Sequence, residues 1–300
     1  MELRHLRFFT AVAEHLNFSR AAEALHTSQP SLSQQIRKLE RQLGGALFER
    51  TKRYVALTEL GKDLLVEAQG ILEAADGLVL RMRDSSGVPR GRLRVGSIVP
   101  ATIGVLPRVL PSYRERFPLV EISVTTVGLD DQVRALAERR IDVGILRGPV
   151  SDERILTARM ADEFFCASLP KNHALAQRKR VAMHDLKSET LVKLQSERGG
   201  SYNDDVWNML RSNNICPVAV LEVSDVAAVF ALIASGVGVG ISSTVFCDSS
   251  FSQVVFRPLT PRTPLKSMMV ACRRDRQFAP VVRSFIEHVE SLKLVFAPPV

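Results

Sequence analysis

Residues 28–43, SQPSLSQQIRKLERQL, decide the fold of the first part of the chain. Ser28 is placed to cap a helix, and Pro30 lies in its first turn, where a missing N–H group costs nothing. Four apolar residues then recur at helical spacing, namely Leu32, Ile36, Leu39 and Leu43. The opposite face carries Gln29, Ser33, Gln34, Arg37, Lys38 and Arg41. The stretch therefore predicts an amphipathic helix whose polar face is available to a partner.

The segment before this helix predicts two further helices. Residues 3–13 keep helical apolar spacing, and Ser19 is placed to cap a short helix over 20–25. A tight turn joins the short helix to the polar-faced one, which is the arrangement of a helix-turn-helix. We therefore expect a helix-turn-helix domain over residues 1–58.

A hairpin is predicted next, with strands at 47–50 and 54–57, so the domain is expected to carry a wing. The tip of the hairpin is basic and consists of Thr51, Lys52 and Arg53. The first 57 residues hold nine Lys or Arg against five Asp or Glu, and the whole chain has a formal net charge of +8. This balance suits contact with a polyanion.

Residues 59–90 are expected to form a dimerisation helix and a hinge. Thr58 is placed as the helix cap, and the helix carries an apolar stripe that the small first domain cannot cover alone. The stripe consists of Leu60, Leu64, Ala68, Ile71, Leu72, Ala75, Leu78, Val79 and Met82. Either a second chain or the following domain could cover it. Dimerisation is favoured because a helix of this length has two faces to satisfy.

From residue 91 to 300, predicted strands and helices alternate, which indicates an α/β fold with βαβ units and a mainly parallel sheet. The pattern restarts near residue 162, so two lobes are expected. The first would comprise 91–161 and 265–300, and the second 162–264. A ligand cleft is expected between them, where strand ends converge.

The sequence offers no catalytic or metal-binding constellation. The glycines of GVGVGIS do not form a GxGxxG motif, and neither GxSxG nor HExxH occurs. The six histidines and four cysteines are dispersed, so we expect no metal, no cofactor and no enzyme activity. Redox sensing would need two neighbouring reactive cysteines, whereas Cys166 lies in an apolar run that is typical of a core thiol, and nothing beside Cys216 suggests a lowered pKa.

The sequence predicts a cytoplasmic protein. No apolar run reaches the roughly 18 residues that a membrane helix needs. The first residues, MELRHLRFFTAVAEHLNFSR, are amphipathic, unlike the basic tip and apolar core of a secretory signal.

Residues 1–65 resemble the DNA-binding domain of the LysR-type transcriptional regulators. The positions that carry the resemblance are Ala21-Ala22, Ser28-Gln29-Pro30-Ser31-Leu32-Ser33, Leu39-Glu40, Leu43-Gly44, Leu47-Phe48-Glu49-Arg50 and Leu57-Thr58. The remainder is similar to the effector half of the family at Gly91-Arg92-Leu93-Arg94-Val95-Gly96, Leu106-Pro107, Phe117-Pro118, Ile141-Asp142-Val143-Gly144-Ile145, and Pro170 with His173-Ala174-Leu175. The opening MELRHLRFF and the strand that ends at Arg147 resemble the branch that regulates aromatic-acid catabolism.

The resemblance implies a winged helix-turn-helix, a long dimerisation helix and a two-lobed α/β effector domain of the periplasmic-binding-protein type. It also implies a bacterial transcriptional activator that binds double-stranded promoter DNA and assembles as a dimer of dimers. The effector would be a small molecule, with a carboxylate suspected, and the resemblance admits RNA polymerase as a further partner.

The resemblance places the start of a DNA-recognition helix in this sequence. The residues expected to face base edges in the major groove are Gln29, Pro30, Ser33 and Gln34. Many family members have Arg at the position of Gln34, and the amide here favours adenine over guanine. Ser28, Ser31 and Lys38 are expected to contact phosphates, while the wing residues Lys52 and Arg53 would enter the minor groove. Ser28 could also be simply a helix cap, and Arg37, Lys38 and Arg41 a solvated face.

The resemblance places the effector between the lobes. The expected lining is Ser97, Pro100, Ala101, Thr102, Leu129, Arg147, Gly200, Ser201, Tyr202, Val223 and Ser224. Free N–H groups at a helix start near Tyr202, together with the guanidinium of Arg147, could hold a carboxylate. Alternatively, Ser201 or Asn203 only caps that helix and Arg147 pairs with a nearby acid. Pro100 stands where several relatives have Ser, which removes one donor.

Other functions remain as alternatives to an effector-responsive regulator. Within the same family, the chain could lack a small-molecule effector or sense redox state. Outside it, the chain could be a cytoplasmic solute-binding module or an enzyme built on the α/β part. A steep fall of DNA affinity with salt would separate the first class from the others.

Overall fold

The computed structural model describes residues 1–50, 54–83, 89–195, 202–248, 251–277 and 279–296. The chain divides into two compact units, one of Met1–Gly91 with Glu138–Arg140, and one of Arg92–Ala137 with Ile141–Val300. Within the described ranges, no helix has both the length and the apolar content that spanning a membrane requires.

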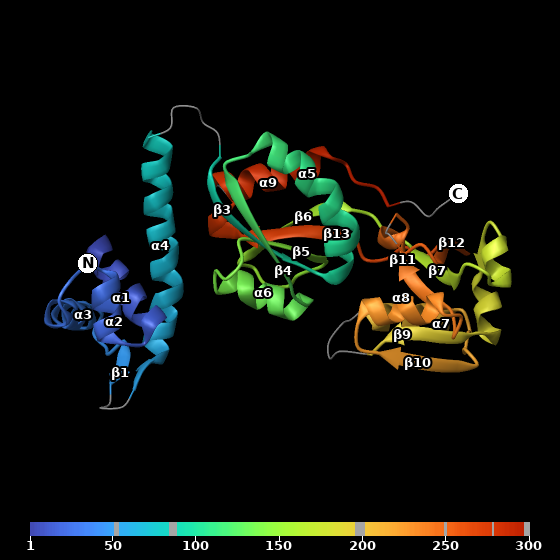
Figure 1. Cartoon of the computed structure of the whole chain (residues 1–300), viewed down its shortest axis with the longest axis horizontal. Helices are drawn as coiled ribbons and strands as arrows, with labels where there is room; N and C mark the ends of the chain where they lie inside the picture. The colour runs from blue at the N-terminus through green and yellow to red at the C-terminus, as the bar shows by residue number, and fades with distance from the viewer. Residues whose placement is uncertain (51–53, 84–88, 196–201, 249–250, 278, 297–300) are drawn as a thin grey trace. The chain divides into compact units, whose positions relative to one another are not determined.

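The first unit is a winged helix-turn-helix followed by one long helix (Figure 1). The three helices of the small domain and the two strands of the wing precede the long helix α4 in the predicted order. Their bounds are α1 Leu3–His15, α2 Phe18–Ala24, α3 Gln29–Leu43, β1 Phe48–Arg50, β2 Val55–Leu57 and α4 Glu59–Arg83. The strands β1 and β2 pair antiparallel, which confirms the hairpin.

Local side-chain caps set the helix starts. The Ser28 hydroxyl accepts a hydrogen bond from the Ser31 N–H at 3.4 Å, as predicted. The predicted cap at Ser19 is wrong, because Asn17 Oδ1 accepts from the N–H groups of Ser19 and Arg20 and starts α2 two residues earlier. The earlier start lets Phe18 join the buried core of the domain.

The helix α4 has one covered face and one open face. Ala68 is buried, and Leu64 and Leu72 are partly buried, against the core of the winged helix. Close approach requires Gly61, since a Cβ there would lie 2.2 Å from the Leu47 carbonyl oxygen. The open face carries Leu60, Ile71, Leu78 and Val79, which are between 41 and 51 % exposed in the single chain.

The second unit has two lobes, each built around one larger sheet (Figure 1). Lobe I is built on a five-stranded sheet of order β4-β3-β5-β13-β6, with the helices α5, α6 and α9. The strands are β3 Gly91–Ser97, β4 Val120–Thr126, β5 Val143–Arg147, β6 Ile155–Ala161 and β13 Met268–Arg273. The helices are α5 Leu106–Arg116, α6 Leu129–Ala137 and α9 Pro280–Ser291.

Lobe II is built on a four-stranded sheet of order β11-β7-β12-β8 and a parallel pair of β9 with β10. The strands are β7 Phe165–Pro170, β8 Val181–Ala182, β9 Thr190–Leu194, β10 Ala219–Val223, β11 Gly240–Ser243 and β12 Val254–Thr260. The helices are α7 Tyr202–Ser212 and α8 Val226–Ala234.

The expectation of a mainly parallel sheet is met only in part, because each larger sheet contains a strand that runs against its neighbours. In lobe I, β3 and β5 are parallel, but β13 runs antiparallel to both β5 and β6. The reason is the route of the chain: β5 ends at Arg147, and β13 returns from lobe II and begins at Met268, directly opposite that residue. In lobe II, β7 pairs antiparallel with β11 and with β12.

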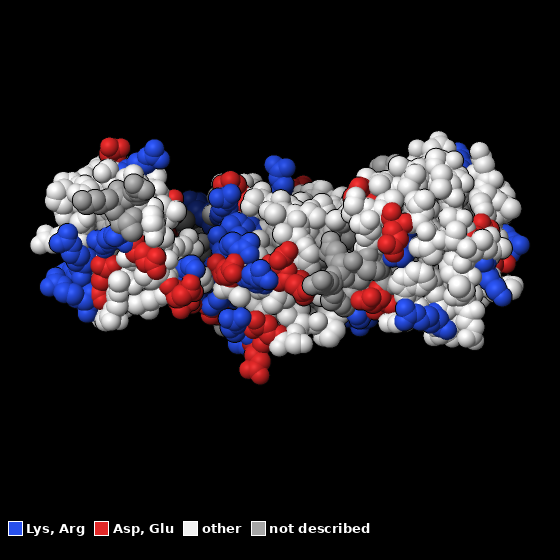
Figure 2. All heavy atoms as spheres, turned by 90° about the horizontal axis from the view of Figure 1, so that it is seen from below, with Lys and Arg blue, Asp and Glu red and all other residues white. Residues whose placement is uncertain are grey.

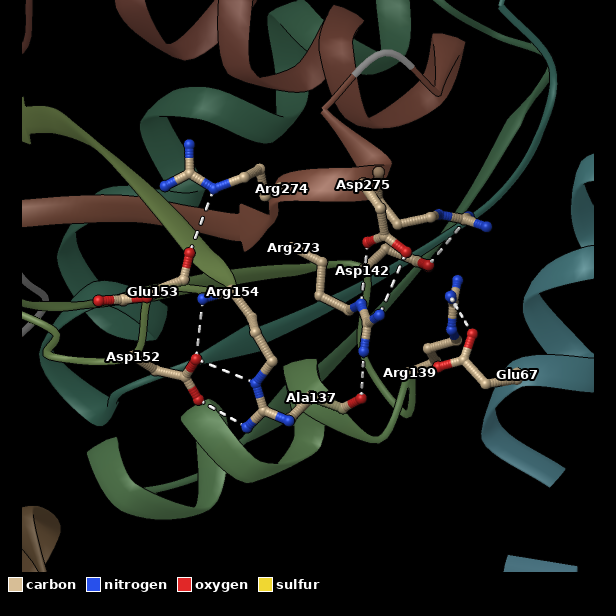
Figure 3. Close-up of polar contacts among 11 residues, drawn as sticks. Glu67, Ala137, Arg139, Asp142, Asp152, Glu153, Arg154, Arg273, Arg274 and Asp275 are labelled. Carbon is tan, nitrogen blue, oxygen red and sulfur yellow. Dashed lines mark hydrogen bonds and ion pairs between the residues drawn. The ribbon is translucent and has the colours of Figure 1, made fainter. Parts of the chain in front are cut away.

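Much of the basic charge of lobe I is paired locally (Figure 3). The Arg154 guanidinium binds both carboxylate oxygens of Asp152 and lowers the pKa of that carboxyl to about 2. Arg273 binds Asp275 and also donates to the Ala137 carbonyl. This pairing does not leave a continuous positive surface, and Figure 2 shows blue and red atoms side by side over this part.

Candidate DNA interface and lobe junction

The polar face of α3 is exposed at the start of the helix. The side chains of Gln29, Gln34, Arg37 and Lys38 are exposed, as are Ser28 and Pro30, while Ser31 is half-buried. The opposite face is held by Leu32, Ile36 and Leu39, all fully buried. Figure 2 shows Lys and Arg atoms gathered at the edge that α3 occupies in Figure 1. The helix can thus be presented to a partner without disturbing its core.

Ser33 is a correction to the predicted DNA-contacting set. Its side chain is only 7 % exposed, because it follows Leu32 on the side of α3 that turns into the domain. The Gln29 amide nitrogen donates to the Ser33 hydroxyl at 3.1 Å. Ser33 therefore orients Gln29 instead of facing a base itself.

A shallow groove of about 640 Å³ lies beside the second half of α3. It is lined by Gln34, Arg37, Glu40, Arg41, Gly44, Gly45 and Ala46. Glu40 fixes the geometry there, since its carboxylate accepts from the Leu47 N–H at 3.0 Å and from Arg50 at 2.9 Å. These bonds attach the wing to α3. The wing-tip residues Lys52 and Arg53 lie outside the described residues.

A buried polar cluster of the second unit lies where the two lobes meet. Arg147 ends β5 of lobe I, and both its Nε and an NH2 nitrogen bind Glu163, at 2.6 and 2.7 Å. The hydroxyl of Ser243, from β11 of lobe II, donates to the same carboxylate. Glu163 lies on the crossing segment between β6 and β7, and its side chain is fully buried. One carboxylate thus joins the two lobes.

This pairing bears on the predicted role of Arg147. Its side chain is only 11 % exposed, and its guanidinium is already neutralised by Glu163. The structure therefore agrees with the alternative that Arg147 pairs with a nearby acid, and that acid is Glu163. An anionic ligand would therefore have to compete with Glu163.

The remaining predicted effector residues of lobe I surround the start of a helix. This helix begins as a π-helical turn, η1 Ala101–Val105, that continues into α5. Ser97 and Ala101 are fully buried. Thr102 is half-buried, and its hydroxyl donates to the Ile98 carbonyl at 3.3 Å. Pro100 and Leu129 are also half-buried.

The predicted effector residues of lobe II are only partly described. Gly200 and Ser201 lie outside the described residues, and Tyr202 is described in its backbone alone, at the start of α7. Val223 is half-buried and Ser224 exposed. Val223 and Ile103 of η1 pack against the same apolar cluster, so the structure brings these parts of the two lobes together.

Sequence reasoning missed Glu163 and Ser243. Neither belongs to a motif, and 80 positions separate them along the chain. The only available signal was the acidic pair Asp162-Glu163 directly before the apolar FFCASL stretch, where a charge is costly unless it is paired. Among the described residues, no group of His, Cys, Asp and Glu is arranged to hold a metal ion.

Comparison with known families decides the identity. The family described as "LysR substrate binding domain" matches residues 86–293, and "Bacterial regulatory helix-turn-helix protein, lysR family" matches residues 3–62. The chain belongs to the LysR family of transcriptional regulators. This LysR-type regulator is 36 % identical to the Hca operon transcriptional activator HcaR of Escherichia coli, over 97 % of each chain. The expectation that the chain is not an enzyme is confirmed by these relatives.

Solved structures of LysR-type regulators share the fold. Full-length OxyR from Pseudomonas aeruginosa matches with a TM-score of 0.73 at 25 % identity, covering 97 % of this chain and 95 % of that one. Full-length CbnR in complex with its target DNA matches at 0.66 and 27 % identity, covering 97 and 99 %. The effector-binding domain of BenM with its effector benzoate matches at 0.59 and 25 %, covering 68 % of this regulator and 92 % of that chain.

Proposed function

We propose that this LysR-type regulator reads promoter DNA with the exposed start of α3 and responds to a small carboxylate at the lobe junction. In this proposal residues 1–58 bind DNA, 59–90 dimerise, and 91–300 bind the effector and extend the assembly to a dimer of dimers in the cytoplasm. The observation that carries the proposal is that α3 exposes a polar face while its opposite, apolar face is buried in the domain core.

The DNA-binding part rests on the chemistry of that face. Gln29 and Gln34 offer amides that can pair bidentately with adenine, and Lys38 and Arg37 can neutralise phosphates. Ser28 and Ser31 lie at the helix start, where hydroxyl and N–H groups suit phosphate oxygens. The CbnR complex with its target DNA supports this use of the domain. The open apolar face of α4 supports pairing with a second copy.

The variant Gln29→Ala is expected to lower sequence preference, because the Gln29 amide is exposed and is held in place by its hydrogen bond to the Ser33 hydroxyl. Binding to DNA selected by the natural protein from a randomised pool should weaken by roughly 1–3 kcal/mol. Binding to scrambled DNA and the slope of affinity against salt should stay unchanged. Fluorescence anisotropy over a salt series measures both quantities.

Two control variants sharpen this test. Ser33→Ala removes the hydroxyl that orients Gln29 and should give a smaller loss of the same kind. Arg41→Ala, at the far end of α3, should leave sequence preference intact. An equal loss of affinity for selected and scrambled DNA with Gln29→Ala would refute the assignment of Gln29 to base reading.

The effector part rests on the charge cluster at the lobe junction. Arg147 offers a guanidinium that a carboxylate could bind if Glu163 gave up one of its bonds. Val223 of lobe II and Ile103 of η1 in lobe I pack against one apolar cluster, and Thr102 lies in the same turn with a half-buried side chain. The family description of a substrate-binding domain and the benzoate complex of BenM support a small carboxylate as effector.

Thermal unfolding of the full chain with a panel of aromatic and aliphatic carboxylates tests this part. A carboxylate that binds the folded chain should stabilise it by about 2.7 kcal/mol at one hundred times its Kd. The matching amides serve as controls and should give no shift, because they lack the charge that Arg147 would bind. Equal shifts with acids and amides, or none with any acid, would contradict a carboxylate effector.

A further inference from the structure

Two cysteines that are far apart in the sequence share one apolar cluster of lobe II. Cys166 is the second residue of β7 and is fully buried, and Cys247 follows the short 3-10 turn η4 Thr244–Phe246. Cys247 is half-buried and packs against the cluster that contains Cys166, Phe230 and Phe246. The two thiols lie close enough to interact directly with each other.

Backbone pairing explains why they meet. The strand β11 pairs antiparallel with β7 and sets Ser242 opposite Cys166, whose thiol donates to the Ser242 carbonyl at 3.4 Å. The chain then turns through η4, and the Cys247 N–H bonds to the Thr244 carbonyl at 3.1 Å. Cys247 is thereby folded back over the strand pair that carries Cys166. The contact depends on strand register, so no sequence spacing reveals it.

The two thiols differ in access. Cys247 retains exposed surface, whereas Cys166 is sealed in the cluster. Burial raises the pKa of the Cys166 thiol well above its ordinary value, and the neighbouring Cys247 and the Glu163 carboxylate raise it further. An oxidant in solution therefore meets Cys247 first, and Cys166 reacts only with a group already inside the cluster.

We propose that Cys166 and Cys247 form a dithiol that a hydroperoxide converts into a disulfide within the chain. The Cys247 thiolate attacks the peroxide O–O bond, which gives a Cys247 sulfenic acid and releases an alcohol, or water if the oxidant is hydrogen peroxide. The Cys166 sulfur then attacks the sulfenic sulfur and displaces water, forming the S–S bond. The two thiols are oxidised, the peroxide is reduced, and a thiol reductant reverses the reaction.

The position of the pair connects its oxidation to the lobe junction. Asp248, the residue after Cys247, pairs with Arg108 of α5 in lobe I. Val245, two residues before Cys247, packs into the core of lobe I against Gly104 of η1. The segment around Cys247 touches lobe I. A disulfide bond from Cys247 to Cys166 on β7 would therefore anchor this segment to the sheet of lobe II. The proposal concerns a modification site and does not depend on the identity of the effector.

The test uses the full chain with Cys216→Ser, because Cys216 is exposed and would otherwise form bonds between chains. The protein is treated with hydrogen peroxide, denatured, alkylated and analysed by mass spectrometry. We expect two of the three remaining thiols to escape alkylation, and a cross-linked peptide that contains residues 166 and 247. Formation of the cross-link should become faster as pH rises, since thiolate is the reacting form.

Matched variants separate the steps. Cys166→Ser should stop the reaction at a Cys247 sulfenic acid that dimedone traps, and Cys247→Ser should leave Cys166 unmodified. Cys272→Ser is the buried control, because Cys272 lies on β13 in the core of lobe I, and it should leave the cross-link unchanged. Full alkylation of Cys166 after oxidation of Cys247 to sulfinic acid, or no oxidation of either residue, would overturn the proposal.

Discussion

Replacing Glu163 by Ala is expected to lower the free energy of unfolding by roughly 3–5 kcal/mol, because it removes the carboxylate that binds the buried guanidinium of Arg147. Both carboxylate oxygens of Glu163 are engaged, one with Arg147 alone and the other with Arg147 and Ser243. The substitution would therefore remove one set of bonds that join lobe I to lobe II. Denaturant unfolding of the full chain, followed by circular dichroism, measures the change.

Glu163→Gln is the matched variant for the same site. It keeps the shape of the side chain and one acceptor for Arg147, so we expect a smaller loss of stability than with Ala. It also removes the negative charge that competes with a ligand carboxylate. If a carboxylate effector uses Arg147, its binding should tighten by roughly tenfold, the value of one charge-assisted hydrogen bond of about 1.5 kcal/mol.

Two results would contradict this account of the junction. A Glu163→Ala chain as stable as the natural one would mean that the Arg147–Glu163 pair contributes nothing to the fold. A Glu163→Gln chain that binds carboxylates no better than the natural chain would mean that Arg147 does not receive the ligand. The first concerns stability and the second effector binding, so the two can fail separately.

Gly104→Ala is expected to disturb the contact between the lobes at η1. A Cβ at this position would lie 2.2 Å from the Val245 carbonyl oxygen and 2.4 Å from Val245 Cγ1. Overpacking of this kind costs roughly 1–3 kcal/mol or more. The gain of roughly 0.5–1 kcal/mol that Ala brings to a helix does not offset it. The same unfolding experiment should therefore show a net loss of stability.

The double variant Gly104→Ala with Val245→Ala serves as the control. Trimming the valine side chain removes the Cγ1 contact but leaves the contact with the backbone oxygen, so it should not restore stability. Full rescue by the double variant would show that the side chain, and not the backbone, limits the approach of η1 to η4. A stabilised single variant would contradict the close packing altogether.

The helix α3 shows what local sequence information can predict. Its apolar spacing and the cap at Ser28 are present in the structure at their predicted positions. The same holds for the hairpin, whose two strands pair antiparallel. These features follow from interactions within a few residues, which a pattern in the sequence encodes directly.

The functional residues were predictable only in part. Gln29, Gln34, Arg37 and Lys38 are exposed on α3, in keeping with helical periodicity. The periodicity did not show that Ser33 turns into the domain and supports Gln29, because that depends on how α3 packs on its neighbours. A single helix wheel cannot distinguish a polar residue at the edge of the buried face from one in solvent.

The sequence by itself determined the family, the winged helix and the two-lobed α/β architecture of this regulator. Only the tertiary structure decided that Arg147 is neutralised by Glu163, that Ser243 completes the pair, and that Cys166 meets Cys247. These contacts join residues about 16 to 81 positions apart, and strand register and the return of the chain between lobes bring them together. Such contacts leave no periodic trace in the sequence, because their partners are chosen by the fold and not by neighbours along the chain.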